Sequence, residues 1–253
     1  MSAKLFVIIP GFGGPHYEKK IQILQNNISI LQSSDWSQLD IRVCVYDEAI
    51  MSYVPMELIN HPNITWIHKR GIVGQFIHEF ATPELVSLYD YILIILDDIE
   101  LYPSVDFKKI VATDKILKMD IYSPCMTLDS KFQFKYMLHI PDQPPSIKIT
   151  PACEAFCYFM RSDVYPSYWK HIDPQRNPWI WGLDMCLLKC LGLRACIFNH
   201  MEMKHWYKNE CYHMRPDSNP CDGYNSVIEK FGVTSEELAD QPAILYWIFP
   251  PMN

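Results

Sequence analysis

The chain has 253 residues, a formal net charge of -7 and 49% hydrophobic or aromatic residues. A chain of this length and composition can bury a full hydrophobic core within one domain. It is acidic and shows no basic stripe, so it lacks the lysine and arginine clusters that supply most of the affinity for nucleic acid. Nucleic-acid binding is therefore excluded as its main function.

The sequence contains neither a membrane-crossing segment nor a zinc-binding motif. No stretch reaches the roughly 18 apolar residues that a membrane-crossing helix needs, and the first apolar run, residues 5–10, is too short for a secretory signal. The nine cysteines lie mostly inside apolar runs, and their spacings do not match a zinc knuckle. We expect a soluble, cytoplasmic protein with reduced thiols and no structural zinc.

The first half of the chain alternates apolar strands with helical patterns. Strands are predicted over residues 5–10, 41–46, 64–67 and 89–101, and helices over residues 17–31 and 72–80. The first strand ends in the glycine-rich turn of residues 10–14, which allows close approach of the backbone to a ligand. This alternation predicts a mainly parallel sheet whose functional edge lies at the carboxyl ends of its strands.

The second half predicts further strands over residues 120–126, 152–160 and 195–199. Helices are predicted over residues 107–119 and 185–191, from a cap at residue 162 or 163 to residue 171, and within residues 223–240. Apolar residues alternate with others at Phe132, Phe134, Tyr136 and Leu138, which predicts a smaller antiparallel excursion. Residues 243–251 are expected to form a packed closing segment.

Three acidic residues, Asp97, Asp98 and Glu100, crowd the end of the apolar strand predicted over residues 89–101. Open α/β sheets bind ligands at this end of their strands. Like charges so close together raise one another's pKa unless a cation neutralises them, and oxygen ligands favour Mg²⁺ or Mn²⁺ over zinc. The alternative is an acidic, solvated turn.

Two more motifs follow in the second half. Trp181-Gly182-Leu183-Asp184 opens a helix, and a histidine, His205 or His200, follows the late strand. In this order, the acidic cluster, the aromatic-Gly-x-Asp turn and the histidine resemble the GT-A fold of nucleotide-sugar glycosyltransferases. The chain also resembles the soluble glycosyltransferases encoded by chloroviruses, which would place it in the host cytoplasm. The resemblance implies one GT-A-like α/β domain with a mainly parallel central sheet flanked by helices. Residues 1–118 would form its nucleotide-binding half and residues 119–253 its acceptor-binding and catalytic half.

The resemblance assigns the acidic cluster to a divalent metal and the nucleotide. Asp98 and Glu100 would hold the ion, since alternate residues of an extended stretch point the same way, and His205 would complete its shell. An imidazole ligand favours Mn²⁺, with Mg²⁺ also possible. Asp97 would face the ribose. The remaining nucleotide contacts are assigned by topology to Pro10, Gly11, Tyr46, Asp47 and Arg70.

Asp184 is the candidate general base that would deprotonate the acceptor hydroxyl, with inversion at the anomeric carbon. The same residue could instead cap the helix that it opens. A double displacement would need a carboxylate nucleophile, for which Glu154 is the candidate. Trp179 and Trp181 would stack on sugar faces of the acceptor or simply pack.

The implied activity is metal-dependent transfer of a sugar from a nucleoside-diphosphate donor, most simply a UDP-sugar, to a hydroxyl of a glycan. A nucleotidyltransferase is one alternative, but it normally needs a basic, glycine-rich signature after the first strand to hold a triphosphate, and the turn of residues 11–15 has no nearby arginine. A non-catalytic carbohydrate-binding protein is the other.

Overall fold

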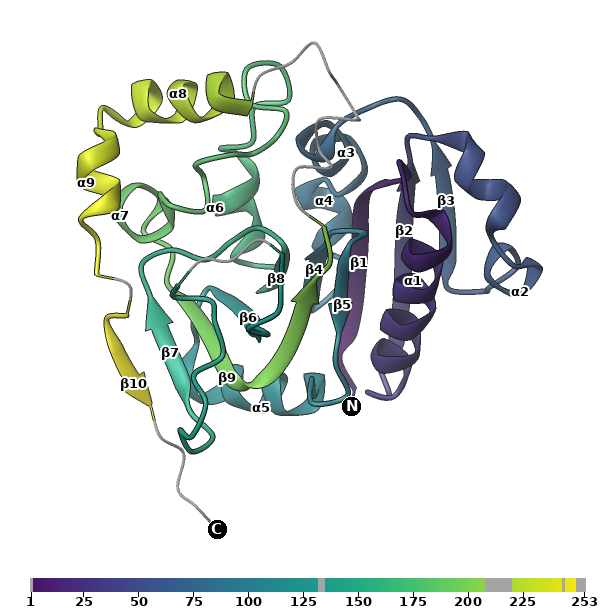
Figure 1. Ribbon diagram of the computed structural model, residues 1–253, viewed down its shortest axis with the longest axis horizontal. Coiled ribbons are helices and arrows are strands. Elements are labelled where there is room, and N and C mark those ends of the chain that lie inside the picture. Colours follow the sequence, from purple (N-terminus) through teal and green to yellow (C-terminus); the bar gives the residue numbers. More distant parts are fainter. Residues whose placement is uncertain (1, 132–134, 208–219, 243, 249–253) are drawn as a thin grey trace.

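A computed structural model describes residues 2–131, 135–207, 220–242 and 244–248. Over these residues one mixed sheet runs through the molecule in the order β10-β7-β9-β6-β8-β4-β1-β2-β3, with β5 paired to β9 off this path. Figure 1 shows the strands of the N-terminal half at one end of the sheet and those of the C-terminal half at the other end. The predicted α/β architecture is confirmed.

The N-terminal half holds the parallel part of the sheet. Its strands are β1 (Lys4–Phe12), β2 (Gln38–Val45), β3 (Ile64–His68) and β4 (Tyr91–Ile95), and β1 lies between β2 and β4. All five residues of β4 are buried, as expected for a central strand of a sheet that is covered on both faces. The helical elements of this half are α1 (Tyr17–Gln32), the 3-10 helix η1 (Glu48–Tyr53), α2 (Met56–Ile59), α3 (Val73–Phe80) and α4 (Pro83–Val86).

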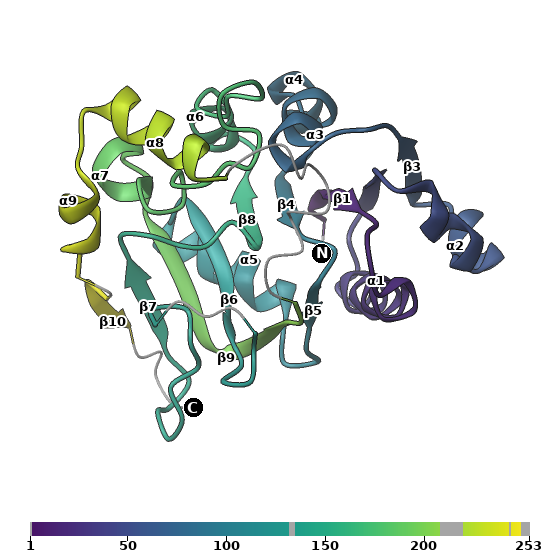
Figure 2. The same cartoon turned by 45° about the horizontal axis from the view of Figure 1, so that its top comes forward.

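The C-terminal half continues the same sheet with strands of both directions. β8 (Cys157–Arg161) is antiparallel to both β4 and β6 (Ile121–Met126), whereas β6 and β9 (Ala195–His205) are parallel. β7 (Ile147–Thr150) and β10 (Tyr246–Ile248) complete the outer edge. The helices of this half are α5 (Phe107–Leu117), α6 (Tyr165–Trp169), α7 (Leu187–Leu191), α8 (Pro220–Phe231) and α9 (Ser235–Ala239). Figure 2 shows α7, α8 and α9 together at the end of the sheet far from α1 and α2.

The prediction of a single strand over residues 89–101 is wrong. β4 ends at Ile95, a turn closed by a hydrogen bond from Ile99 N–H to the Leu96 carbonyl follows, and the chain resumes as β5 (Ile99–Leu101). β5 pairs with β9 rather than continuing β4. Asp98 lies in this turn and Glu100 in β5, so the two do not share one extended stretch.

Two other predicted elements shift in the second half. The strand predicted over residues 152–160 begins only at Cys157, and β9 continues past residue 199 to His205. Phe132 and Phe134 lie outside the described residues, Leu138 makes an isolated parallel bridge to Met126, and the antiparallel strand is β7. Part of the closing segment forms β10, while residues 243 and 249–251 lie outside the described residues.

The described part of the chain contains no helix with the length and apolar character needed to cross a membrane. The cysteines described are free thiols and most are buried.

Candidate functional site

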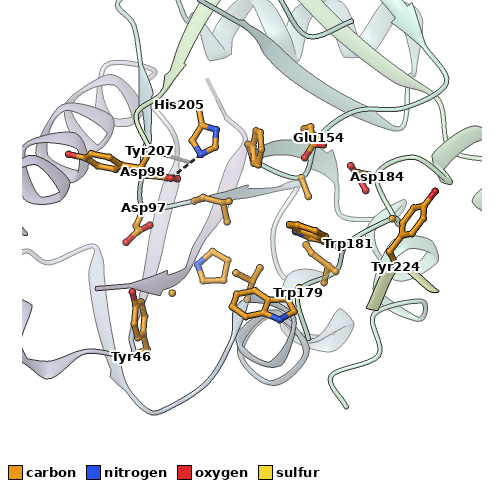
Figure 3. Close-up of a pocket in the computed structure, with 18 of the residues that line it drawn as sticks. Tyr46, Asp97, Asp98, Glu154, Trp179, Trp181, Asp184, His205, Tyr207 and Tyr224 are labelled. Atoms are coloured by element: carbon orange, nitrogen blue, oxygen red, sulfur yellow. Dashed lines mark hydrogen bonds and ion pairs between the residues drawn. The ribbon is translucent and has the colours of Figure 1, made fainter. Parts of the chain in front are cut away.

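A cavity of about 240 Å³ lies at the carboxyl ends of β1 and β4 (Figure 3). Its walls come from segments far apart in sequence, including the β4–β5 turn, residues 154–156, residues 179–185 and the end of β9. The predicted site residues that line it are Pro10, Gly11, Tyr46, Asp97, Asp98, Trp179, Trp181, Asp184 and His205. The predicted functional edge of the sheet therefore contains a cavity lined by nine of the twelve predicted site residues.

Asp98 and His205 form a buried pair in this cavity. Their side chains lie 2.9 Å apart, from His205 Nε2 to Asp98 Oδ2, and the residues are only 7% and 6% exposed. The register between β5 and β9 brings them together, because His205 pairs with Ile99, the residue after Asp98. Burial raises the pKa of Asp98, but the His205 imidazole and the Lys20 charge together more than offset this and hold the pKa below its ordinary value. His200, the alternative histidine, does not line the cavity and packs edge-on against Phe198.

The second carboxylate oxygen of Asp98 remains available for a ligand. Asp98 Oδ1 is buried and accepts no hydrogen bond from the described residues. A buried acceptor without a partner is costly, so it marks a place where a cation or donor group fits. Within the described part of the chain, no three His, Cys, Asp or Glu side chains come close enough to hold an ion together. The pair would therefore supply two protein ligands and leave other positions for ligand oxygens.

Asp97 is neutralised by Lys20, a residue that the sequence interpretation missed. Lys20 is only 2% exposed, lies 2.9 Å from the Asp97 carboxylate, and donates a hydrogen bond to the Gly13 carbonyl at 2.6 Å. Burial raises the pKa of Asp97 to about 6, against the lowering effect of Lys20. The signal was present: Lys20 precedes Leu24 by four residues and so falls on the buried face of α1.

Glu100 does not line the cavity. Its carboxylate accepts hydrogen bonds from Lys19 at 3.3 Å and from the Trp206 indole N–H at 2.6 Å. The ammonium of Lys19 also lies 4.0 Å from the centre of the Trp206 ring. The structure thus gives each of the three acids a different partner and brings only Asp98 to a histidine.

The predicted nucleotide residues divide into two groups. Pro10, Gly11 and Tyr46 line the cavity. Asp47 instead accepts hydrogen bonds from Gly14 N–H at 3.3 Å and from the Tyr17 hydroxyl at 2.7 Å, so it braces the glycine-rich turn. Arg70 is exposed and is not part of the cavity wall.

Glu154 and Asp184 face the cavity from the side opposite Asp97 and Asp98 (Figure 3). They are 8% and 7% exposed, and their side chains lie next to each other in the cavity wall (Figure 3). Two carboxyl groups can share a hydrogen bond only if one of them is protonated. Burial raises the pKa of both, and for Glu154 the Asp184 charge raises it further, well above its ordinary range. Asp184 does not cap α7, whose N-cap residue is Cys186.

The loop before Asp184 has an unusual backbone. Ile180 has a φ of 56°, a rare conformation for a β-branched residue, and Gly182 has a φ of 85°. The Asn177 side chain closes this loop with a hydrogen bond to the Trp181 carbonyl at 2.9 Å. Trp179 is buried, whereas Trp181 is 37% exposed beside the cavity. The loop thus combines a packed and a partly accessible tryptophan.

A scan against family models and a search of curated protein sequences find no match to the chain. Solved structures do resemble it. GalNAc-T7, crystallised with UDP, GalNAc and Mn²⁺, has a TM-score of 0.60 at 11% identity, over 94% of this chain and 50% of that one. S. aureus TarS 1-349 has a TM-score of 0.54 at 11% identity, over 89% of this chain and 72% of that one. The same TarS fragment in complex with UDP-GlcNAc gives 0.55 at 12% identity, over 90% and 65%. The chain thus spans half the length of the GalNAc-T7 chain, and the likeness confirms the expected GT-A-like fold.

Proposed function

We propose that this protein is a metal-dependent glycosyltransferase that moves a sugar from a nucleoside-diphosphate donor, most simply a UDP-sugar, to a hydroxyl of a glycan. The observation that carries the proposal is the cavity at the carboxyl edge of the sheet. It has the buried Asp98–His205 pair on one side and the Glu154–Asp184 carboxyl pair on the other. Solved structures of the same fold contain UDP or UDP-GlcNAc, which supports this donor class.

Asp98 and His205 are the proposed metal ligands. One carboxylate and one imidazole suit Mn²⁺ better than Mg²⁺, and the unpartnered Asp98 oxygen fits a cation. When bound, such an ion neutralises the negative charge that develops on a departing diphosphate. Lys20 places a second positive charge in the same cavity wall, and its ion pair with Asp97 holds that carboxylate in position. In this arrangement Glu100 acts outside the cavity, where it orients Lys19 and Trp206.

The nucleotide is proposed to lie against residues 1–118 and the acceptor against residues 119–253. Pro10, Gly11 and Tyr46 offer backbone and an aromatic ring to the base and ribose. Trp181 is the accessible aromatic surface for an acceptor sugar, while the buried Trp179 supports the loop. Arg70 stays a proposed diphosphate contact only if its exposed side chain folds inward when the donor binds.

Asp184 is the proposed general base, and inversion is the proposed outcome. Its raised pKa brings a carboxylate closer to the basicity needed to accept a hydroxyl proton. Glu154 is a poor nucleophile for a double displacement, because burial and the neighbouring Asp184 charge raise its pKa and so favour the protonated form, which has no negative charge to attack with. The arrangement of the two acids therefore favours Asp184 as a general base over Glu154 as a nucleophile, and so favours inversion over a double displacement.

Donor turnover measured with Mn²⁺ and with EDTA tests the proposal. We expect release of nucleoside diphosphate from UDP-sugars with Mn²⁺ and loss of that release in EDTA; equal rates would remove the metal from the mechanism.

Asp184→Asn should keep donor binding and abolish transfer, and a fully active variant would disprove the role of Asp184 as base. Release of pyrophosphate instead of nucleoside diphosphate would identify a nucleotidyltransferase. Glycan binding without donor binding would identify a carbohydrate-binding protein.

A further inference from the structure

Glu154 stands out because it is an acid on a buried cavity wall with no cationic partner among the residues that the structure describes. It lies in the turn of residues 151–156 that replaces the start of the predicted strand, so its side chain reaches the cavity rather than the sheet interior. Its neighbour in this wall is the equally buried side chain of Asp184 (Figure 3). Neither carboxyl group makes an ion pair with the described lysines, arginines or histidines.

The titratable groups around the two acids are other weak acids. Phenols and thiols approach from the segment before β7, the 151–156 turn, β8, α6 and the start of α7: Tyr136, Cys153, Tyr158, Tyr168 and Cys186. Burial raises the pKa of each of these groups, so all are uncharged near neutral pH. Lys189, on α7, is turned to Glu237 at 3.3 Å. A second negative charge at the pair would therefore find no compensating cation in the described surroundings.

We propose that Glu154 and Asp184 work as one carboxyl–carboxylate pair that holds a single proton, in which Glu154 donates its hydrogen bond to Asp184 and positions that carboxylate for the acceptor hydroxyl. The role in catalysis rests on the proposed function, whereas the shared proton is a property of the folded protein alone. Glu154 is thus a positioning residue that acts through Asp184.

The proton balance of the step is simple. The acceptor oxygen forms a bond to the anomeric carbon while the bond from that carbon to the diphosphate breaks, and the electron pair leaves with the diphosphate. The hydroxyl proton passes to the Asp184 carboxylate, so the pair then holds two protons. One of them returns to solvent when the product leaves, which restores the singly protonated pair.

This arrangement limits activity at both ends of the pH range. Protonation of Asp184 at acid pH removes the base. Deprotonation of Glu154 at alkaline pH removes the hydrogen bond and sets two negative charges side by side in a buried wall. The alkaline limb of the pH profile should therefore depend on residue 154.

Two substitutions separate the hydrogen bond from the titration. Glu154→Gln keeps a donor in place of the protonated carboxyl and cannot ionise, whereas Glu154→Ala removes the donor. We expect kcat of Glu154→Gln within about threefold of the wild type near neutral pH, without the alkaline limb, and kcat of Glu154→Ala lower by about tenfold or more. Glu57→Gln, an exposed substitution on α2, is the matched control and should leave the profile unchanged. An alkaline limb that persists in Glu154→Gln, or equal loss in both Glu154 variants, would overturn the positioning role.

A second measurement, of protein stability, tests the shared proton independently of enzyme activity. Below the ordinary glutamate pKa, residue 154 is protonated in both folded and unfolded chains. As the pH rises above it, only the unfolded chain releases the proton, so the wild type loses stability relative to Glu154→Gln. Denaturant titrations from about pH 4 to pH 8 should show this difference growing with pH, and it should stay flat for Glu57→Gln. A flat difference for Glu154→Gln would overturn the shared proton, whereas failure of donor turnover with a growing difference would overturn only the proposed function.

Discussion

At the scale of single residues, the three acids after β4 have different partners and hence different roles. Lys20 neutralises Asp97, His205 pairs with Asp98, and Lys19 and Trp206 bind Glu100. A sequence motif cannot separate these roles, because all three acids lie within four residues of one another. The separation arises from the turn after β4 and from the pairing of β5 with β9.

Asp98→Asn and Glu100→Gln test this division. We expect Asp98→Asn to lower metal-dependent donor turnover by about 100-fold or more, because it removes the charge of a proposed ligand. Glu100→Gln should retain turnover to within a few fold, since its side chain bonds outside the cavity. Steady-state kinetics over a Mn²⁺ series will measure both. A larger loss in Glu100→Gln than in Asp98→Asn would show that Glu100, rather than Asp98, is the more important of the two predicted metal ligands.

Lys20→Met tests the buried ion pair on the other side of the turn. The substitution leaves the Asp97 carboxylate, only 11% exposed, without its cation, and such a loss typically costs about 3–5 kcal/mol in the free energy of unfolding when the charge is buried. The neighbouring Lys19→Met is the matched control. Lys19 is partly exposed, so its loss should cost less than about 1 kcal/mol.

The double variant Lys20→Met/Asp97→Asn completes this cycle. Because it removes both charges, it should recover most of the stability lost in Lys20→Met, as measured by denaturant unfolding at neutral pH. Additive losses from the two substitutions would show that the pair contributes nothing to the stability of the turn.

At the scale of elements, the loop of residues 177–183 carries strain next to the cavity. A positive φ in a β-branched residue costs on the order of 1–3 kcal/mol, and it persists only where surrounding contacts enforce it. Those contacts include the Asn177 hydrogen bond to the Trp181 carbonyl and the hydrogen bond from Gly74 N–H to the Pro178 carbonyl at 2.7 Å. The loop therefore fixes Trp181 and the approach to Asp184 more firmly than an ordinary surface turn would.

Gly182→Ala should disrupt this loop. A Cβ at Gly182 would lie 2.8 Å from the Tyr224 ring, and the φ of 85° disfavours any side chain. We expect a loss of about 2–4 kcal/mol in unfolding free energy and a raised KM for the acceptor. Gly192→Ala is the control, because Gly192 has a φ of 71° but no atom within 4 Å of the added Cβ, so it should cost only about 1 kcal/mol. Equal losses in the two variants would show that backbone conformation alone accounts for the effect.

The elements that the sequence predicted well are those with one dominant local signal. The apolar strands β1 and β2 and the periodic helix α1 lie where hydrophobic pattern places them. The break between β4 and β5 was missed because the apolar run continues through residue 96 and resumes at residue 99. Only the tertiary pairing of β5 with β9 shows where β4 ends, and no local pattern contains that information.

At the scale of the whole molecule, the cavity joins both halves of the chain at one edge of the sheet. The motif order predicted Asp98, His205 and Asp184 as neighbours of this edge, because strand ends converge there. Lys20 and the pairing of Glu154 with Asp184 depend on how α1 and the 151–156 turn pack, so sequence pattern could not reveal their contacts. The partners of charged groups, rather than the groups themselves, were the part hidden from sequence.

A ligand that binds across both halves must stabilise the whole fold, and this gives the last prediction. A UDP-sugar with Mn²⁺ at about 100 times its Kd should add about 2.7 kcal/mol to the free energy of unfolding. For a chain of this size that corresponds to a rise in Tm of about 5–10 °C. Nucleotide in EDTA, or Mn²⁺ without nucleotide, should raise Tm much less, because the Asp98–His205 pair offers only two protein ligands and needs diphosphate oxygens to complete a shell. Asp98→Asn should lose the Mn²⁺-dependent part of the shift, measured from the Tm of its own ligand-free form. The same rise in EDTA as in Mn²⁺ would show that nucleotide binds without the ion, and the proposed ligand pair would then have to be reassigned to a hydrogen-bonding role.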